Sequence, residues 1–242
     1  MKANPLCLIA LVLGAVAATP ASATSPCEKR TFESQPFTVC AADLAERDVR
    51  LFLRRADGAN YGDPEALPRD KLLFATNAGM FNAAHMPIGL YLAEGQQTTS
   101  LNTKNGGGNF HLQPNGVFWI KEGKAAISTT FDFSTTKPAA DLATQSGPML
   151  VINGTLNGNF DVNGPSRYIR NGIGITDPAH IFVAISDEPV SFGVFARLFR
   201  DDLKCFNALY FDGAVSRLFQ PDQPDGFGGS ELGPLLGVYD RK

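Results

Sequence analysis

The chain has 242 residues, of which 44% are hydrophobic, and its formal net charge is −3 at pH 7. The apolar content is too high for a disordered chain, and the charge gives no electrostatic support for nucleic-acid binding. The length suits one domain with a full hydrophobic core.

The N-terminus has the three parts of a secretory signal peptide. Lys2 supplies the positive charge, Leu6–Ala18 is the apolar run, and Ala21-Ser22-Ala23 offers small residues at a cleavage site. The apolar run is too short to span a membrane. We therefore expect cleavage near Ala23, a secreted or periplasmic protein and no stable membrane insertion. The predicted layout is a signal peptide over residues 1–23, an N-terminal arm over 24–36 and one domain over 37–242.

Three cysteines remain after the predicted cleavage: Cys27, Cys40 and Cys205. An oxidising compartment favours one disulfide and one spare thiol. The local pair Cys27–Cys40 would fasten the N-terminal arm, and Cys40–Cys205 is the alternative, so both pairings stay open. Because no paired cysteines or HExxH motif accompany them, no metal site is predicted, and a divalent cation held by carboxylates stays an open question.

Apolar runs separated by turn residues predict a strand-rich chain. Hairpins are expected at residues 116–129 and 149–156, the second because Asn153-Gly154 tolerates the positive φ of a tight turn. A long polar loop over 102–115 contains three consecutive glycines and precedes the first hairpin. Further strands are expected at residues 49–54, 72–76 and 88–93.

One unit of the chain predicts a crossover connection. Ile181–Ile185 reads as a strand, Ser191 can cap a helix, and Ala208–Phe211 reads as a second strand. Between the strands, phenylalanine, alanine and leucine recur at helical spacing. A strand, a helix and a strand within about 30 residues predict a right-handed βαβ unit with parallel strands. The predicted fold class is α+β, a single domain with a strand-rich mixed sheet, hairpins and at least one such unit.

Parallel strands end on one edge of a sheet, so the crossover predicts that Asp187 and Asp212 lie near the same rim, where ligands gather in such sheets. Asp212 ends a buried strand beside Gly213. A partly desolvated carboxylate of this kind serves as a general acid or base, and the alternative is an aspartate that caps the glycine turn. Asp187 is a candidate second carboxylate, and the alternative is an acidic loop beside Pro189.

Four other segments offer groups that could bind an anion. Arg170 carries a planar fork of donors suited to phosphate, and the alternative is a surface charge. Asn77 and Gly79, and likewise Ser146 and Gly147, could present an amide, a hydroxyl or backbone N–H groups, although turns explain both pairs. His111, in the glycine-rich loop, is either a proton shuttle or a packing residue.

Six ordered motifs resemble the phosphodiester glycosidase family over roughly residues 37–240. They are Asn77-Ala-Gly-Met-Phe81, Pro87-Ile-Gly-Leu90, Gly108-Asn-Phe-His-Leu-Gln-Pro-Asn-Gly-Val-Phe118, Gln145-Ser-Gly-Pro-Met-Leu-Val151, Arg170-Asn-Gly-Ile-Gly174 and Ala208-Leu-Tyr-Phe-Asp-Gly213. The resemblance places the family's arginine at Arg170 and its strand-end Asp-Gly at Asp212-Gly213. Ala214 and Val215 stand where many members carry further glycines, and Ser216 keeps the hydroxyl.

The resemblance implies an exported hydrolase that cleaves a sugar from a sugar-phosphate phosphodiester in the envelope, without an organic cofactor. In this interpretation Arg170, Asn77 and the Ser146-Gly147 backbone hold the phosphate, while Asp212 and Asp187 act at the glycosidic oxygen. The alternative function is a non-catalytic envelope module that binds a glycan or a peptide at the same rim.

Overall fold

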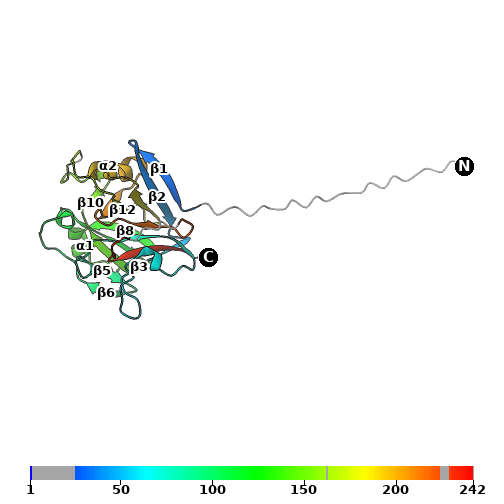
Figure 1. Cartoon of the computed structure of the whole chain (residues 1–242), viewed down its shortest axis with the longest axis horizontal. Coiled ribbons are helices and arrows are strands. Elements are labelled where there is room, and N and C mark those ends of the chain that lie inside the picture. Colours follow the sequence, from blue (N-terminus) through cyan, green and yellow to red (C-terminus); the bar gives the residue numbers. More distant parts are fainter. Residues whose placement is uncertain (2–24, 162, 224–228, 242) are drawn as a thin grey trace.

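The computed structural model describes Met1 and residues 25–161, 163–223 and 229–241. The predicted cleavage near Ala23, and the predicted signal peptide apart from Met1, lie outside the described residues. Strands dominate the described part of the chain, and they form three sheets with short helices beside them (Figure 1). The predicted strand-rich single domain is confirmed.

The largest sheet has seven strands in the order β1-β2-β13-β12-β14-β10-β11. Every pairing in it is antiparallel. Its strands are β1 (Cys27–Phe32), β2 (Gln35–Asp43), β10 (Met149–Ile152), β11 (Thr155–Leu156), β12 (Asn171–Asp177), β13 (His180–Ser186) and β14 (Asn207–Asp212).

The other two sheets are also antiparallel, and the predicted hairpins at 116–129 and 149–156 are both present. The four-stranded sheet is β15 (Leu218–Phe219), β4 (Leu72–Asn77), β16 (Leu235–Asp240) and β3 (Arg47–Phe52). The five-stranded sheet is β6 (Gln96–Thr99), β5 (Tyr91–Ala93), β9 (Leu142–Ser146), β7 (Gly116–Lys121) and β8 (Lys124–Thr129).

Helix α2 (Phe192–Arg197) covers one face of the seven-stranded sheet, at the top of Figure 1, and continues into a π-helical turn at Leu198–Asp202. Ser191 caps it as predicted, because its hydroxyl accepts a hydrogen bond from the Val194 N–H. The close packing explains the alternating glycines of β12: a Cβ at Gly174 would lie 2.6 Å from the Phe199 ring. Helix α1 (Thr130–Thr136) follows β8, and 3-10 turns occupy Pro64–Ala66 and Asn109–His111.

The predicted crossover is present in a modified form. β13 and β14 each pair antiparallel with β12, so they run in the same direction, but β12 lies between them. β13 and β14 are thus parallel as predicted, but within the described residues all paired strands are antiparallel, so the predicted mixed sheet is wrong. The physical reason is that β12 and β13 form a hairpin, which places β12 in the gap that the crossover spans. The right-handedness stays a prediction.

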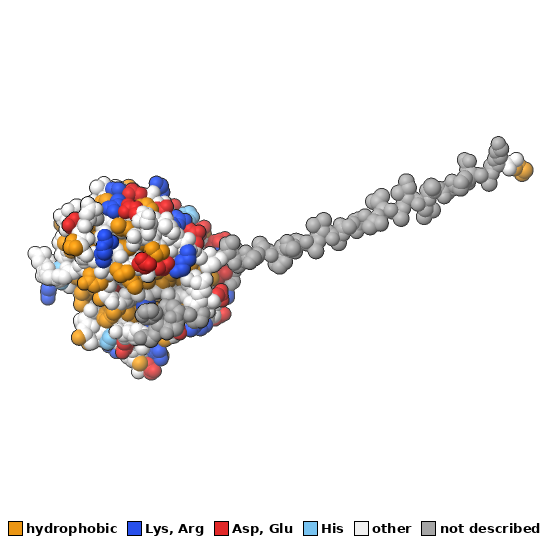
Figure 2. Space-filling view, turned by 45° about the horizontal axis from the view of Figure 1, so that its top comes forward, with side chains coloured by type: hydrophobic (Ala, Val, Ile, Leu, Met, Phe, Trp, Pro, Cys, Tyr) orange, Lys and Arg blue, Asp and Glu red, His pale blue; other side chains and the backbone are white. Residues whose placement is uncertain are grey.

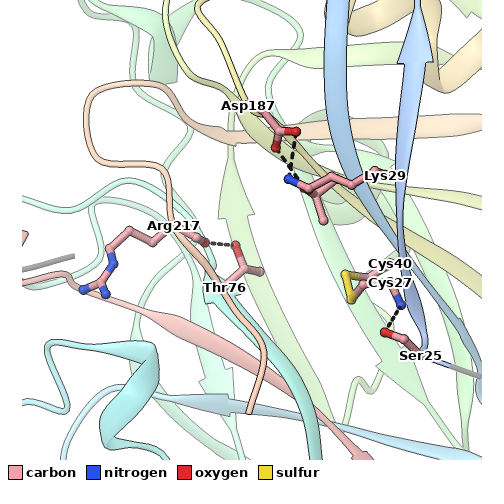
Figure 3. The surroundings of a disulfide bond; sticks show 8 residues. Ser25, Cys27, Lys29, Cys40, Thr76, Asp187 and Arg217 are labelled. Carbon is pink, nitrogen blue, oxygen red and sulfur yellow. Dashed lines mark hydrogen bonds and ion pairs between the residues drawn. A yellow bond between two sulfur atoms is a disulfide. The ribbon is translucent and has the colours of Figure 1, made fainter. Parts of the chain in front are cut away.

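The segment expected as an N-terminal arm contains β1, which pairs along its whole length with β2. The disulfide is Cys27–Cys40, the local one of the two predicted pairings, and it joins residues directly opposite each other (Figure 3). Cys205 is a buried free thiol, and burial raises its pKa to about 12. The disulfide therefore fixes the edge strand of the sheet to its neighbour.

Replacing both bridged cysteines, as in C27A/C40A, is expected to lower the free energy of unfolding by about 3 kcal/mol. The disulfide closes a chain separation of 13 residues, and its loss frees the unfolded chain. Urea unfolding under non-reducing conditions measures the difference. A reductant should lower the stability of the unsubstituted protein but leave the double variant unchanged. A loss below about 1 kcal/mol would contradict the expectation.

The helices in the described ranges all lack the length and apolarity that a bilayer crossing requires. On the face that Figure 2 shows, acidic and basic side chains are interspersed. Ion pairs at the protein surface include Arg197 with Glu33 and Arg200 with Asp201. Exposed pairs of this kind contribute little to stability, so the fold depends chiefly on its buried sheet faces.

Candidate functional site

A cleft of about 640 Å³ opens beside the ends of β13 and β14. One wall is the end of β13 with Lys29 of β1 and Thr38 of β2, and the other is the segment that follows β14. This second wall comprises residues 213–218 and is completed by Leu232 and its neighbours. The predicted meeting of the segments after β13 and β14 at one rim is therefore seen in the structure.

Asp212 is the last residue of β14 and precedes Gly213, the first residue of the second wall, but it is not itself among the residues that line the cleft. It is 7% exposed, and its Oδ1 accepts hydrogen bonds from the N–H groups of Gly213 at 2.6 Å and Ala214 at 2.8 Å. Burial raises the pKa of the Asp212 carboxyl, and the N–H groups of residues 213–215 offset only part of that rise. The carboxyl thus caps a turn, and its pKa is raised, as is that of carboxyls that act as general acids.

Asn171, the first residue of β12, supports this turn through side-chain hydrogen bonds. Its Oδ1 accepts hydrogen bonds from the Asp212 N–H at 3.1 Å and the Ser216 hydroxyl at 3.2 Å. Its Nδ2 donates to the Thr76 hydroxyl at 2.8 Å and to Asn77 Oδ1 at 2.9 Å. Both asparagines are fully buried, so their amides join the four-stranded sheet to the seven-stranded sheet. The sequence reasoning missed Asn171, although it follows Arg170 directly.

Arg170 extends on the opposite side of β12 and is fully buried. Its Nε donates to the Val190 carbonyl at 2.9 Å, Nη1 to the Tyr210 hydroxyl at 3.1 Å and Nη2 to the Ser166 carbonyl at 3.1 Å. The guanidinium carbon lies 3.7 Å from the centre of the Phe192 ring. Burial lowers the pKa of Arg170. The side chain is held within the fold and is not among the residues that line the cleft.

Tyr210 connects Arg170 to the Asp212 turn. The Tyr210 hydroxyl accepts the hydrogen bond from Arg170, and a Cβ built on Gly213 would lie only 1.9 Å from that hydroxyl. The absence of a side chain at Gly213 therefore lets the turn rest on Tyr210. Tyr210 therefore contacts both Arg170 and the turn that follows Asp212.

The substitution Gly213→Ala is expected to lower stability by about 1–3 kcal/mol, because the added methyl group must displace the buried Tyr210 hydroxyl. The same displacement moves the turn that holds Asp212. Thermal or urea unfolding measures the loss. Gly158→Ala is the matched control, since a Cβ there meets no atom within 4 Å. Equal stability of the two variants would contradict the close contact.

Asp187 lies on the first wall, just after β13, in a closed triangle of side chains. Its Oδ2 accepts from Lys29 Nζ at 2.9 Å and its Oδ1 from the Thr38 hydroxyl at 2.8 Å, while Lys29 also donates to Thr38 at 2.8 Å. Figure 3 shows Asp187 and Lys29 pointing toward each other close to the disulfide. The sequence reasoning missed Lys29 and Thr38, because it treated the first strand as an arm.

The remaining predicted residues lie beneath or away from the cleft. Ser146 ends β9 fully buried, and its hydroxyl donates to the Phe211 carbonyl at 3.0 Å. Gly79 has φ of +126°, and a Cβ there would lie 3.8 Å from that of Ser146. Gly147 packs against Asn115. Asn77 and Ser146 therefore support the Asp212 strand from below, and none of these residues lines the cleft.

His111 is separate from this group. Its Nδ1 contacts the Lys104 carbonyl at 2.9 Å, and its ring packs over Gly106 in the glycine-rich loop. It does not line the cleft. Among the residues that the structure describes, no three histidine, cysteine or acidic side chains are grouped as metal ligands.

Comparisons with known proteins agree with the motifs. A family model described as phosphodiester glycosidase matches residues 70–227. The uncharacterized protein YigE of Escherichia coli is 34% identical over 219 residues, which cover 88% of this chain and 83% of YigE.

Two solved structures share the fold. One is the catalytic domain of zebrafish N-acetylglucosamine-1-phosphodiester alpha-N-acetylglucosaminidase, auto-inhibited by its pro-peptide. It aligns with a TM-score of 0.61 and 15% identity, over 89% of this chain and 82% of that chain. The other is a hypothetical protein from Synechocystis, with a TM-score of 0.57 and 14% identity, over 89% of this chain and 61% of that one.

Proposed function

Since the chain belongs to the phosphodiester glycosidase family, we propose that it is a hydrolase that releases a sugar from a sugar-phosphate diester. The observation that supports this best is Asp212, a carboxyl whose pKa is raised by burial, directly before the second wall of a cleft large enough for a sugar. The substrate class is an envelope glycan phosphodiester. The disulfide is consistent with an exported protein, and the signal peptide over residues 1–23 belongs to the same proposal.

In the proposed reaction, Asp212 donates a proton to the oxygen that bridges sugar and phosphorus. A carboxyl with a raised pKa carries that proton at a higher pH than an ordinary aspartate does. Asp187, on the facing wall, accepts a proton from the attacking water. The Ser216 hydroxyl, which donates to Asn171 Oδ1 and to the Asp212 carbonyl in the free protein, turns to the departing phosphate and stabilises its charge.

Arg170 and Asn77 take supporting roles in this proposal. Each of the three Arg170 nitrogens donates a hydrogen bond within the fold, so we assign it to holding Tyr210, and through Tyr210 the Asp212 turn. Asn77 Oδ1 accepts from the Arg217 N–H at 2.9 Å and so fixes the far end of the same segment. Ser146 holds the Phe211 carbonyl, and Gly213 lets the turn approach Tyr210. Gly79 and Gly147 allow close packing around Ser146 and Asn115. His111 is not needed in this reaction.

The purified mature protein should release free sugar from a UDP-sugar or from a sugar-phosphate methyl ester. Running the reaction in ¹⁸O-labelled water and locating the label in sugar or phosphate identifies the bond that breaks. The competing function, a glycan- or peptide-binding envelope module, is favoured by the fact that Asp212 already caps its own turn. Absence of sugar release across a broad panel, with retention on a glycan array, would establish that module instead.

A further inference from the structure

The first wall of the cleft contains a cation that the family match does not cover. Lys29 and Thr38 precede residue 70, where the matched region begins. Both nevertheless line the cleft, because β1 and β2 extend the seven-stranded sheet beyond β13. The cleft therefore includes side chains from outside the region that the family model matches.

The Lys29 ammonium is accessible and can change partners. Its side chain is 71% exposed, and its partner Asp187 is 26% exposed. An ion pair between solvated groups holds its members weakly, so an anion in the cleft can take over the lysine at low cost. Asp187 and Thr38 keep the ammonium at the wall while the cleft is empty.

The backbone that carries Lys29 is rigid. Lys29 lies opposite Thr38, two positions along β1 from the disulfide-linked pair Cys27 and Cys40. Residues two apart in a strand point to the same face, so the disulfide and the lysine share that face (Figure 3). The long side chain can move, while its point of attachment stays fixed.

The charged side chains of the cleft favour a monoanion. Among the described residues that line it, Lys29 and Arg217 are cations and Asp187 is an anion. Arg217 is 7% exposed and donates to Asp63 at 2.8 Å, so Lys29 is the more accessible cation. A phosphodiester carries one negative charge, which matches one available ammonium group.

We propose that Lys29 is a substrate-binding residue that contacts the phosphodiester group and selects it over a neutral glycoside. This inference rests on the proposed function of the cleft and adds a specificity determinant to it. On binding, the Lys29 ammonium turns from Asp187 to a phosphate oxygen, which also leaves Asp187 available to water. Thr38 holds the position of Asp187 through its hydroxyl.

The test compares Lys29→Gln, Lys29→Arg and the control Lys124→Gln, which changes an exposed lysine on β8. With a sugar-phosphate methyl ester as substrate, Lys29→Gln should raise KM about 10- to 100-fold, the equivalent of one charge-assisted hydrogen bond. The kcat should change much less, and Lys29→Arg should restore most of the affinity. The preference for the diester over a neutral aryl glycoside should fall by the same factor. Rising salt should raise KM for the unsubstituted protein and leave that of Lys29→Gln flat.

Calorimetric titration of the same methyl ester into Asp212→Asn, with and without Lys29→Gln, separates the two proposals. Turnover by the unsubstituted protein, together with equal affinity in both variants, would overturn the role of Lys29 alone. Lys29-dependent binding without any turnover would overturn the hydrolase and keep the anion site. Absence of both binding and turnover would overturn both.

Discussion

Replacing Asp212 by asparagine is expected to lower turnover of a sugar-phosphate diester by more than about 100-fold, with the fold intact. The asparagine oxygen can still accept the hydrogen bonds that Gly213 and Ala214 donate to Oδ1, so the turn keeps its shape. What disappears is the acidic proton. Initial rates of sugar release, with circular dichroism as the check on folding, measure the effect. Activity close to that of the unsubstituted protein would remove Asp212 from the reaction.

The same pair of proteins gives a pH test with a defined sign. Because burial raises the pKa of Asp212, the folded state holds its proton more tightly than the unfolded state does. The stability that this group contributes is therefore fully present below its ordinary pKa of 3.8 and is lost as pH rises through the raised value. Relative to Asp212→Asn, the unsubstituted protein should lose stability across that window in urea titrations at a series of pH values. A relative gain would mean that the backbone N–H groups outweigh burial.

Replacing Arg170 by alanine is expected to have the largest effect on folding, a loss of about 3–5 kcal/mol in the free energy of unfolding. The substitution removes the side chain that donates to the Val190 and Ser166 carbonyls and to the Tyr210 hydroxyl, and it opens a cavity beside Phe192. A loss of that size is a large part of the stability of a typical domain. Turnover should fall with it, because the Tyr210 support of the Asp212 turn is lost.

Two further variants separate folding from positioning at Arg170. Arg200→Ala removes an exposed arginine paired with Asp201 and should cost less than about 1 kcal/mol. Tyr210→Phe removes only the hydroxyl that Arg170 holds, so it should reduce turnover with a much smaller loss of stability. Urea unfolding and rates on the same diester substrate measure both. A stable and fully active Arg170→Ala protein would show that this network is dispensable.

The turn residues beside the cleft could be identified from the sequence, but the residues that contact them could not. Asp212-Gly213 and Asp187 could be found because each follows an apolar run that reads as a strand. Arg170 was predicted as an anion ligand, and nothing local could reveal that Phe192 and Tyr210 enclose it. Its burial depends on where α2 packs, which is a property of the tertiary structure.

Asn171 and Lys29 show why part of the site escaped prediction. Asparagine before glycine is a common turn signal, so the role of Asn171 as a link between two sheets has no local signature. Lys29 lies on the edge strand β1, which reaches the cleft because its partner β2 pairs with the distant strand β13. Both residues act through contacts with residues that are distant in the sequence, whereas the spacing of apolar residues predicts only local structure.

The two walls of the cleft come from opposite ends of the polypeptide, with Lys29 on one side and residues 213–218 and Leu232 on the other. A nascent chain therefore cannot assemble the pocket until nearly all of it has been synthesised. The edge of β2 that faces away from β1 stays unpaired until β13 has been synthesised. Pairing of strands so far apart in the sequence is slow. Under the proposed function, a chain terminated before residue 213 would carry Asp187 without the second wall, and so would release no sugar.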